Sequence, residues 1–165
     1  PPYDPARQPA PPAAEWSAER LAKANRNYAV EYIRNGVREL VNVLGEERAL
    51  ELCKLAARLT GLQHYARMAE AVGAQDGGPP EAAAFLSAML GGMGDEASVE
   101  QVDESAWAVR QQGTRILRGL EDAEAARLLA CWIEIWRGAI NSHRAFMDVA
   151  VERTGDGLVW TLRAA

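Results

Sequence analysis

Residues 131–144, CWIEIWRGAINSHR, place a thiol, two indoles and a carboxylate within four helical turns. On a helix, Cys131 and Glu134 share one stripe with Arg127, while the two tryptophans lie on the apolar side. A cysteine becomes reactive when a nearby positive charge lowers its pKa, and Arg127 is placed to supply that charge. Cys131 and Glu134 are therefore candidate catalytic groups. The alternative is a small buried cysteine beside a surface ion pair.

A second candidate is His64, which can act as a general base, with Tyr65 beside it as a hydrogen-bond donor. His64 follows Cys53 by eleven residues, which is roughly 16 Å along a continuous helix. These two side chains then share a face without touching, so a dyad within this helix is excluded. A partly buried structural histidine is the alternative interpretation.

Motifs for metals and cofactors are absent from the sequence. There is no CxxC, HxxxH or HExxH pattern and no dinucleotide or phosphate-binding fingerprint. We therefore expect no metal site and no cofactor.

Aromatic residues provide the remaining chemical signal, with five tryptophans and four tyrosines in the chain. Each ring singly suits a hydrophobic core, but rings from several elements can also line a pocket for a planar molecule. Arg110, on a predicted strand, can clamp a carboxylate of such a molecule. The predicted substrate-binding residues are Tyr28, Tyr32, Tyr65, Trp107, Arg110, Trp132, Trp136 and Trp160.

The first half of the chain must position these groups on helices. Ser17 can cap a helix over residues 17–44, whose apolar residues recur every three or four positions. Gly45 suits its end, and a leucine-rich helix follows to about residue 71. Gly61 is placed to bend or divide this second helix. The prolines at 79–80 suit the first turn of a third, short helix.

The second half changes period. Residues 99–110 alternate around a polar turn at 103–105, as in a β-hairpin. A helix over about 121–142 follows, and a second hairpin turns at residues 154–157. The predicted fold class is α+β: N-terminal helices, then hairpin–helix–hairpin, with the antiparallel sheet packed against helices.

The length of 165 residues fits one domain, which we place at residues 16–165. Six of the eight prolines lie in residues 1–12, so residues 1–15 are predicted to be a disordered leader. The net charge of -5 argues against nucleic acid as a partner, and no apolar run is long enough to span a membrane. Only two cysteines are present, which favours a cytoplasmic protein.

Three segments carry a family resemblance: LGEERALELCKLAARLTG (44–61), the helix with Cys131, and TGDGLVWTLR (154–163). They resemble the L-2-amino-thiazoline-4-carboxylic acid hydrolase-like family, whose shape is similar to the vinyl reductase-like small-molecule-binding domains. The resemblance implies this fold and an enzyme that opens a cyclic C=N ring. Family members often carry further cysteines before the last long helix and after the closing Gly-Asp turn. Here those places read Thr114-Arg115-Ile116 and Leu158-Val159-Trp160, so only Cys131 carries over.

Three functions follow from these observations. The first is a small enzyme that hydrolyses, opens or closes a heterocyclic or planar molecule, with His64, Cys131 and Glu134 as catalytic residues. The second is a sensor or carrier that binds such a molecule unchanged. The third is a helical interaction module that forms a homodimer through the apolar face of Val30, Ile33 and Val37 on the first helix.

Overall fold

The helices begin and end close to the predicted residues. In α1 (Ala18–Leu44), the Ser17 hydroxyl accepts a hydrogen bond of 3.2 Å from the backbone N–H of Arg20. Gly45 follows with φ of 80°, and α2 (Glu46–Val72) then runs without a break through Gly61. The helix is therefore not divided at Gly61, contrary to one of the two predicted roles of this glycine. The computed structural model describes residues 15–74, 77–142 and 147–165, so the predicted leader lies almost wholly outside the described residues.

The remaining elements confirm the predicted order. After α3 (Pro79–Gly92), β1 (Glu96–Asp103) and β2 (Ala106–Gln112) form the first hairpin. Helix α4 (Asp122–Ile140) follows, and β3 (Met147–Thr154) and β4 (Gly157–Ala164) form the second hairpin. The sequence pattern missed one short 3-10 helix, η2 (Arg115–Leu117), which leads from β2 toward α4.

The four strands form one antiparallel sheet in the order β1-β2-β4-β3. The two hairpins join through β2 and β4, where Val109 pairs with Trp160. At the first turn, hydrogen bonds from Arg163 and then from Ser105 lower the pKa of Asp103 to about 2. This carboxylate therefore links the turn to the last strand.

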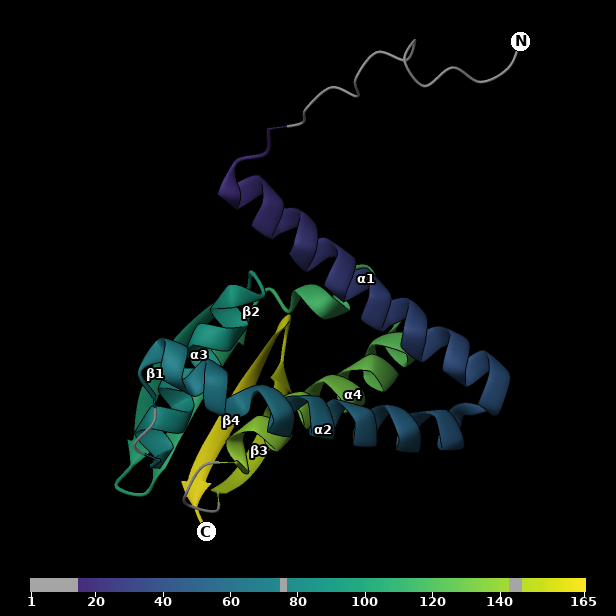
Figure 1. Cartoon of the computed structure of the whole chain (residues 1–165). Coiled ribbons are helices and arrows are strands. Elements are labelled where there is room, and N and C mark those ends of the chain that lie inside the picture. The colour runs from purple at the N-terminus through teal and green to yellow at the C-terminus, as the bar shows by residue number, and fades with distance from the viewer. Residues whose placement is uncertain (1–14, 75–76, 143–146) are drawn as a thin grey trace, which may run out of the picture.

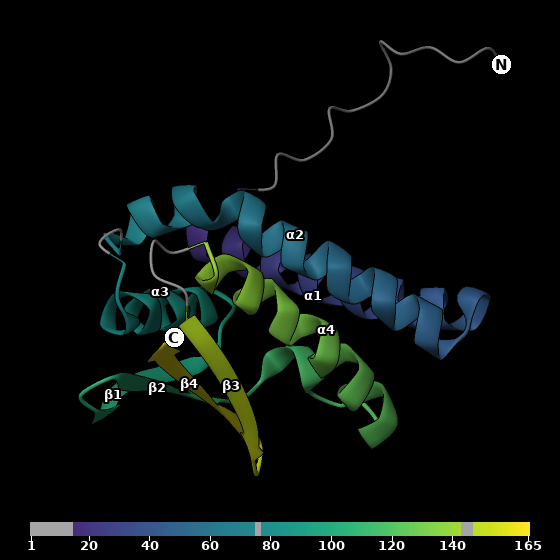
Figure 2. The same ribbon diagram turned by 90° about the horizontal axis from the view of Figure 1, so that it is seen from below.

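The elements stack in layers (Figures 1 and 2). Helices α3 and α4 lie against one face of the sheet, and α1 and α2 lie beyond them. One face of the sheet and the inner faces of α3 and α4 are apolar. Their large side chains pack together between sheet and helices and form the core. Its largest fully buried members include Phe85, Leu86, Leu90, Ile116, Leu128, Ile140, Leu158, Trp160 and Leu162.

Candidate functional site

The most extensive contact between helices is that of α2 with α4, which run side by side in the same direction. The face of α2 that meets α4 is built mainly from small residues four positions apart. Small side chains let two helix backbones approach closely, and this spacing keeps them on one side. The buried residues on this face are Ala49, Ala57, Gly61, Tyr65 and Ala69, with Cys53 partly buried among them.

Two glycines make the close approach possible. A Cβ atom added to Gly61 would lie 2.7 Å from the backbone nitrogen of Ala139, and nearer still to a carbonyl oxygen of α4. A Cβ atom added to Gly138 would lie 2.9 Å from the carbonyl carbon of Arg58. Neither position has room for a side chain, so the two backbones are in direct contact.

Glu134 lies buried at this crossing between two arginines. Its carboxylate accepts a hydrogen bond of 2.8 Å from Nε of Arg58 and one of 2.9 Å from Nη1 of Arg137, and Nη2 of Arg58 also donates to it. Burial raises the pKa of Glu134, but the hydrogen bonds from Arg137 and Arg58 outweigh burial, so the pKa is lowered. Both oxygens are engaged, which makes Glu134 a bridge between α2 and α4.

Cys131 meets Cys53 across the same crossing, and both thiols are free. Burial first, then the neighbouring Cys53, raises the pKa of Cys131 to about 12. Burial also raises the pKa of Cys53. A thiol held protonated in this way is a weak nucleophile.

We expect Cys131 to resist alkylation in the folded chain, since at pH 8 only about 1 thiol in 10,000 is a thiolate when the pKa is about 12. Iodoacetamide labelling with peptide mass spectrometry measures this directly, and the Cys53→Ser variant isolates the Cys131 signal. In urea both cysteines should label rapidly. Equal labelling rates for Cys131 in native and unfolded protein would contradict the assignment.

The predicted tryptophan pocket is instead part of the hydrophobic core. Trp132 and Trp136 are buried and contact each other edge to face, with ring centroids 5.2 Å apart. Trp160 is fully buried, and Trp107 packs against the same core while half-buried. The five main clefts on the described part of the chain are lined by residues other than these tryptophans. These indoles fill the space between sheet and helices.

The other predicted site residues are scattered. Tyr28 and Tyr32 are 78% and 82% exposed on the outer side of α1, and His64 is exposed on α2. Tyr65 is buried, with its ring 5.1 Å from that of Phe85. His64 and Tyr65 therefore face opposite environments although they are neighbours in sequence.

Arg110 points away from the helices, on the solvent face of the sheet. Its Nε and Nη2 donate to the carboxylate of Glu100 on the neighbouring strand, at 2.9 Å and 2.5 Å. Arg110 thus pairs across β1 and β2 on the far side of the sheet from Trp160. Of the three predicted catalytic residues, only Cys131 and Glu134 come together, and they do so in a helix contact.

A buried polar chain that the sequence analysis missed links the sheet to η2. The indole N–H of Trp160 donates to Gln111 at 2.9 Å, and the Gln111 amide donates to Asp95 at 2.6 Å. Asp95 also accepts from the backbone N–H of Arg115 at 2.8 Å. Burial raises the pKa of Asp95, and these hydrogen bonds partly offset it. The missed signal is a lone polar residue, Gln111, on an apolar strand face.

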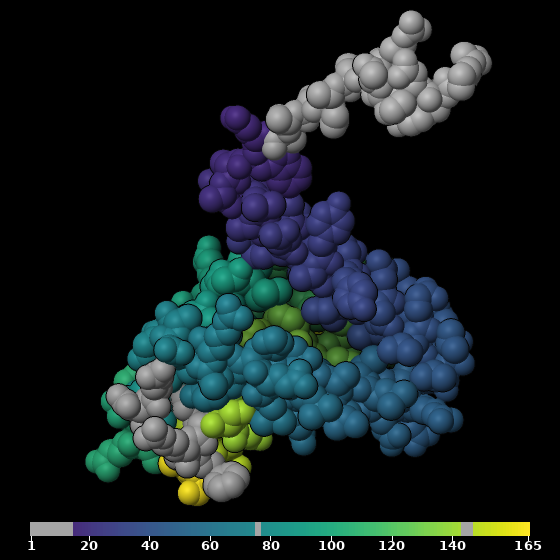
Figure 3. Space-filling view, viewed as in Figure 1, coloured from purple at the N-terminus to yellow at the C-terminus, as the bar shows by residue number. Residues whose placement is uncertain are grey.

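The outer side of α2 carries an exposed row of leucines, opposite the small-residue face that meets α4. We call it the leucine face, and it consists of Leu52, Leu55, Leu59 and Leu62, which are 43–57% exposed. Figure 3 shows α2 along the outer surface, with a hollow between α1 and α2 where green atoms of α4 are visible. A contiguous exposed apolar row is the usual mark of a surface that contacts another protein.

The apolar face predicted for dimerisation on α1 is used within the chain itself. Val30 and Val37 are buried in the core, and Ile33 packs partly buried against it. These three residues are therefore not free to form an interface, because α1 turns this side toward the core. Exposed apolar side chains remain elsewhere on α1, among them Leu21, Tyr28, Tyr32 and Val43, and in the leucine face of α2.

Metal and membrane features were searched over the described residues. No group of three or more metal-ligating side chains occurs among them. Within the same ranges, no helix combines the length and apolar content needed to cross a membrane.

Comparisons with known proteins concern the fold. No family model matches the chain. No curated protein matches it either. Among solved structures, the chain is similar to a trafficking protein particle complex subunit 3 from Naegleria fowleri, described as covalently bound to palmitic acid. The TM-score is 0.67 at 11% sequence identity, over 87% of this chain and 96% of that chain.

This finding overturns the prediction of a hydrolase-like, small-molecule-binding enzyme, since the structural neighbour is a subunit of a trafficking complex. The geometry agrees, because the predicted pocket is filled and His64 lies away from Cys131 and Glu134. The resemblance of the three short segments to the hydrolase-like family remains an untested prediction. At 11% identity, what the comparison shows for this chain is the fold of the trafficking-complex subunit.

Proposed function

We propose that this chain is a non-enzymatic interaction module that pairs with a second copy of itself through the leucine face of α2. The observation that carries the proposal is the exposure of four leucines in one row on a helix that is already packed on its opposite side. A helix with apolar residues on both sides is expected to be covered on both sides. The described residues of the chain cover only the side that meets α4.

The spacing of the leucine face supports a second copy as the partner. The leucines at 52, 55, 59 and 62 are separated by three, four and three residues, so the row reads the same in both directions about residue 57. A two-fold interface requires such self-complementarity, because each residue of one copy must meet its symmetric counterpart on the other. In an antiparallel pair, Leu52 faces Leu62 and Leu55 faces Leu59.

The helix dipole of α2 favours the same antiparallel arrangement. Reversing the second copy opposes the two dipoles, whereas a parallel pair aligns them.

The comparison adds support of a general kind. The similar subunit belongs to a multi-protein complex by its description, which is consistent with a fold that presents surfaces to other chains. For the present chain the partner in our proposal is a second copy, and a different protein partner is an alternative outcome of the test below.

Replacing Leu55 and Leu59 together with glutamate should convert a dimer into a monomer. Each substitution removes a buried leucine, worth about 1.5–3 kcal/mol, from both copies and places like charges together. The dimer dissociation constant should rise by more than about 100-fold. Sedimentation equilibrium measures this, with circular dichroism to confirm that the helical content is unchanged.

The matched control is Val102→Glu, which makes the same kind of change at an exposed apolar residue on the first hairpin. It should leave the dimer intact. A wild-type chain that stays monomeric at about 100 μM would reject self-association, since it implies binding weaker than about 5 kcal/mol. A dimer unaffected by the double substitution would place the interface elsewhere.

A further inference from the structure

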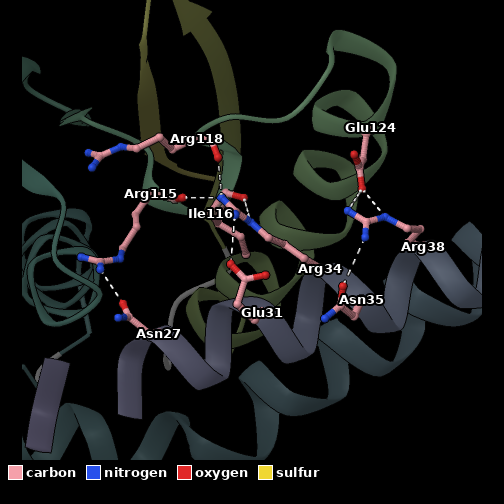
Figure 4. A network of polar contacts seen from close by, with 9 residues as sticks. All are labelled: Asn27, Glu31, Arg34, Asn35, Arg38, Arg115, Ile116, Arg118 and Glu124. Carbon is pink, nitrogen blue, oxygen red and sulfur yellow. Dashed lines mark hydrogen bonds and ion pairs between the residues drawn. The ribbon is translucent and has the colours of Figure 1, made fainter. Parts of the chain in front are cut away.

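An arginine-rich cleft lies between α1 and η2, away from the leucine face. It has a volume of about 340 Å³ and is lined by charged and polar side chains around buried Val30. Figure 4 shows how residues of α1 and η2 surround it. We call it the arginine cleft, and its lining residues are Asn27, Val30, Glu31, Arg34, Arg115 and Arg118.

Arg34 is the structural member of this cleft. Its Nε donates to the carbonyl of Ile116 at 2.9 Å, and its Nη2 donates to the carbonyls of Arg115 and Arg118 at 2.8 Å and 2.9 Å. Its Nη1 donates to Glu31 at 3.2 Å. Arg34 is therefore fully engaged in holding η2 against α1, and Glu31 is its counter-charge.

The guanidinium groups of Arg115 and Arg118 have N–H donors that are available to a ligand. Nη2 of Arg115 donates to the side chain of Asn27 at 2.5 Å, and no described residue accepts a hydrogen bond from the Arg118 guanidinium. Arg115, at the start of η2, and Arg118, just after its end, both line the cleft. Figure 4 shows both extending away from Arg34.

Arg26 adds a third cation at the edge of the cleft. A Cβ atom added to Gly94 would lie 3.2 Å from Nη1 of Arg115 and 3.6 Å from Nε of Arg26, so these two guanidinium groups flank the same glycine. Nε of Arg26 is buried and has no hydrogen-bond acceptor among the described residues. A buried donor without an acceptor is costly unless something else supplies one.

The acidic groups near the cleft form no direct ion pair with these cations. Glu31 pairs with Arg34. The charge of Asp95 attracts Arg115 and Arg118, but its two oxygens accept hydrogen bonds from Gln111 and from the backbone N–H of Arg115. Among the described residues, the guanidinium groups of Arg26, Arg115 and Arg118 therefore have no carboxylate in direct contact. We propose that the arginine cleft binds the phosphate group of a small soluble anion through the guanidinium groups of Arg115 and Arg118, with Arg26 at its edge.

Phosphate fits this arrangement better than a carboxylate does. A dianionic phosphate presents three oxygens, enough to accept from two guanidinium groups at once, and its charge suits cations that form no direct ion pair with a described carboxylate. A single carboxylate offers two oxygens and one negative charge. The site is independent of self-association, because its residues lie on α1 and η2.

The test is calorimetric titration of the full chain with inorganic pyrophosphate at low ionic strength, alongside citrate as a carboxylate probe. Arg118→Gln and Arg115→Gln should each weaken pyrophosphate binding by at least about tenfold, as expected for the loss of a charge-assisted fork. The Arg26 Nε–Hε resonance should shift in an NMR titration of the wild-type chain.

Arg38→Gln is the matched control, because Arg38 lies one turn from Arg34 on α1 but pairs with Glu124 outside the cleft. It should change the affinity by less than about twofold, within the small effect of an exposed charge. Equal losses for Arg38→Gln and Arg118→Gln would overturn the site, as would absence of binding at about 1 mM pyrophosphate. Citrate binding as tight as pyrophosphate would overturn the assignment to phosphate.

Discussion

Replacing Gly138 with alanine should lower the free energy of unfolding by about 3 kcal/mol or more. The new methyl group would lie 2.9 Å from the carbonyl carbon of Arg58 and closer still to its oxygen, so backbone atoms must move apart. Overpacking a well-filled interior typically costs about 1–3 kcal/mol, and a clash with backbone has no flexible side chain to absorb it. Separating α2 from α4 would also stretch the hydrogen bonds between Arg58 and Glu134.

Urea unfolding at fixed protein concentration measures this effect. Gly36→Ala is the control, because Gly36 is exposed in the middle of α1 and a Cβ atom there meets nothing within 4 Å. It should stabilise the chain by up to about 1 kcal/mol, through the higher helix propensity of alanine. The same substitution should thus act in opposite directions at the two sites. A Gly138→Ala variant as stable as wild type would show that the helices are not in direct contact.

Replacing Arg34 with alanine should cost about 2–3 kcal/mol of stability. The side chain is only 13% exposed. It donates to the carbonyls of Arg115 and Ile116 in η2, to that of Arg118 just after η2, and to Glu31. Hydrogen bonds that involve a charged group contribute about 1.5–3 kcal/mol, and removing the donor leaves the carbonyls without a partner. Arg34→Lys should recover only part of the loss, because an ammonium group cannot reproduce the planar fork.

Arg38→Ala provides the comparison for Arg34→Ala on the same helix. Its guanidinium also forms an ion pair, with Glu124, but its side chain is 46% exposed. Exposed pairs contribute about 1 kcal/mol or less, so this variant should remain close to wild type in the same urea titration. Similar losses for the two variants would mean that Arg34 acts as an ordinary surface charge and does not hold η2.

The fold was largely predictable because its signals are local. Apolar spacing, Ser17 and Gly45 located α1, and the alternating segments with polar turns located both hairpins. Gly61 was misread because a glycine inside a helical pattern suggests a break, whereas here it permits the approach of α4. Whether a glycine serves flexibility or contact depends on the neighbouring element, which a single sequence does not contain.

The candidate site was less predictable because it depends on which side of each helix is covered. Helix α2 is apolar on two sides, one small and one leucine-rich, so periodicity alone does not identify the buried one. The tryptophans gave a misleading signal, since large rings from sheet and helix suit a core as well as a pocket. Arg34 and Arg115 come together from positions 81 residues apart, a contact that no local pattern reveals.

The backbone contact at Gly61 and Gly138 has a mechanical consequence for the molecule. Two helices whose backbones touch without intervening side chains resist sliding past each other. We therefore expect α2 and α4 to move as one rigid unit. Helix α1 is joined to this unit by Val30 and Val37, which are buried in the common core, and by the hydrogen bonds of Arg34 to the segment around η2.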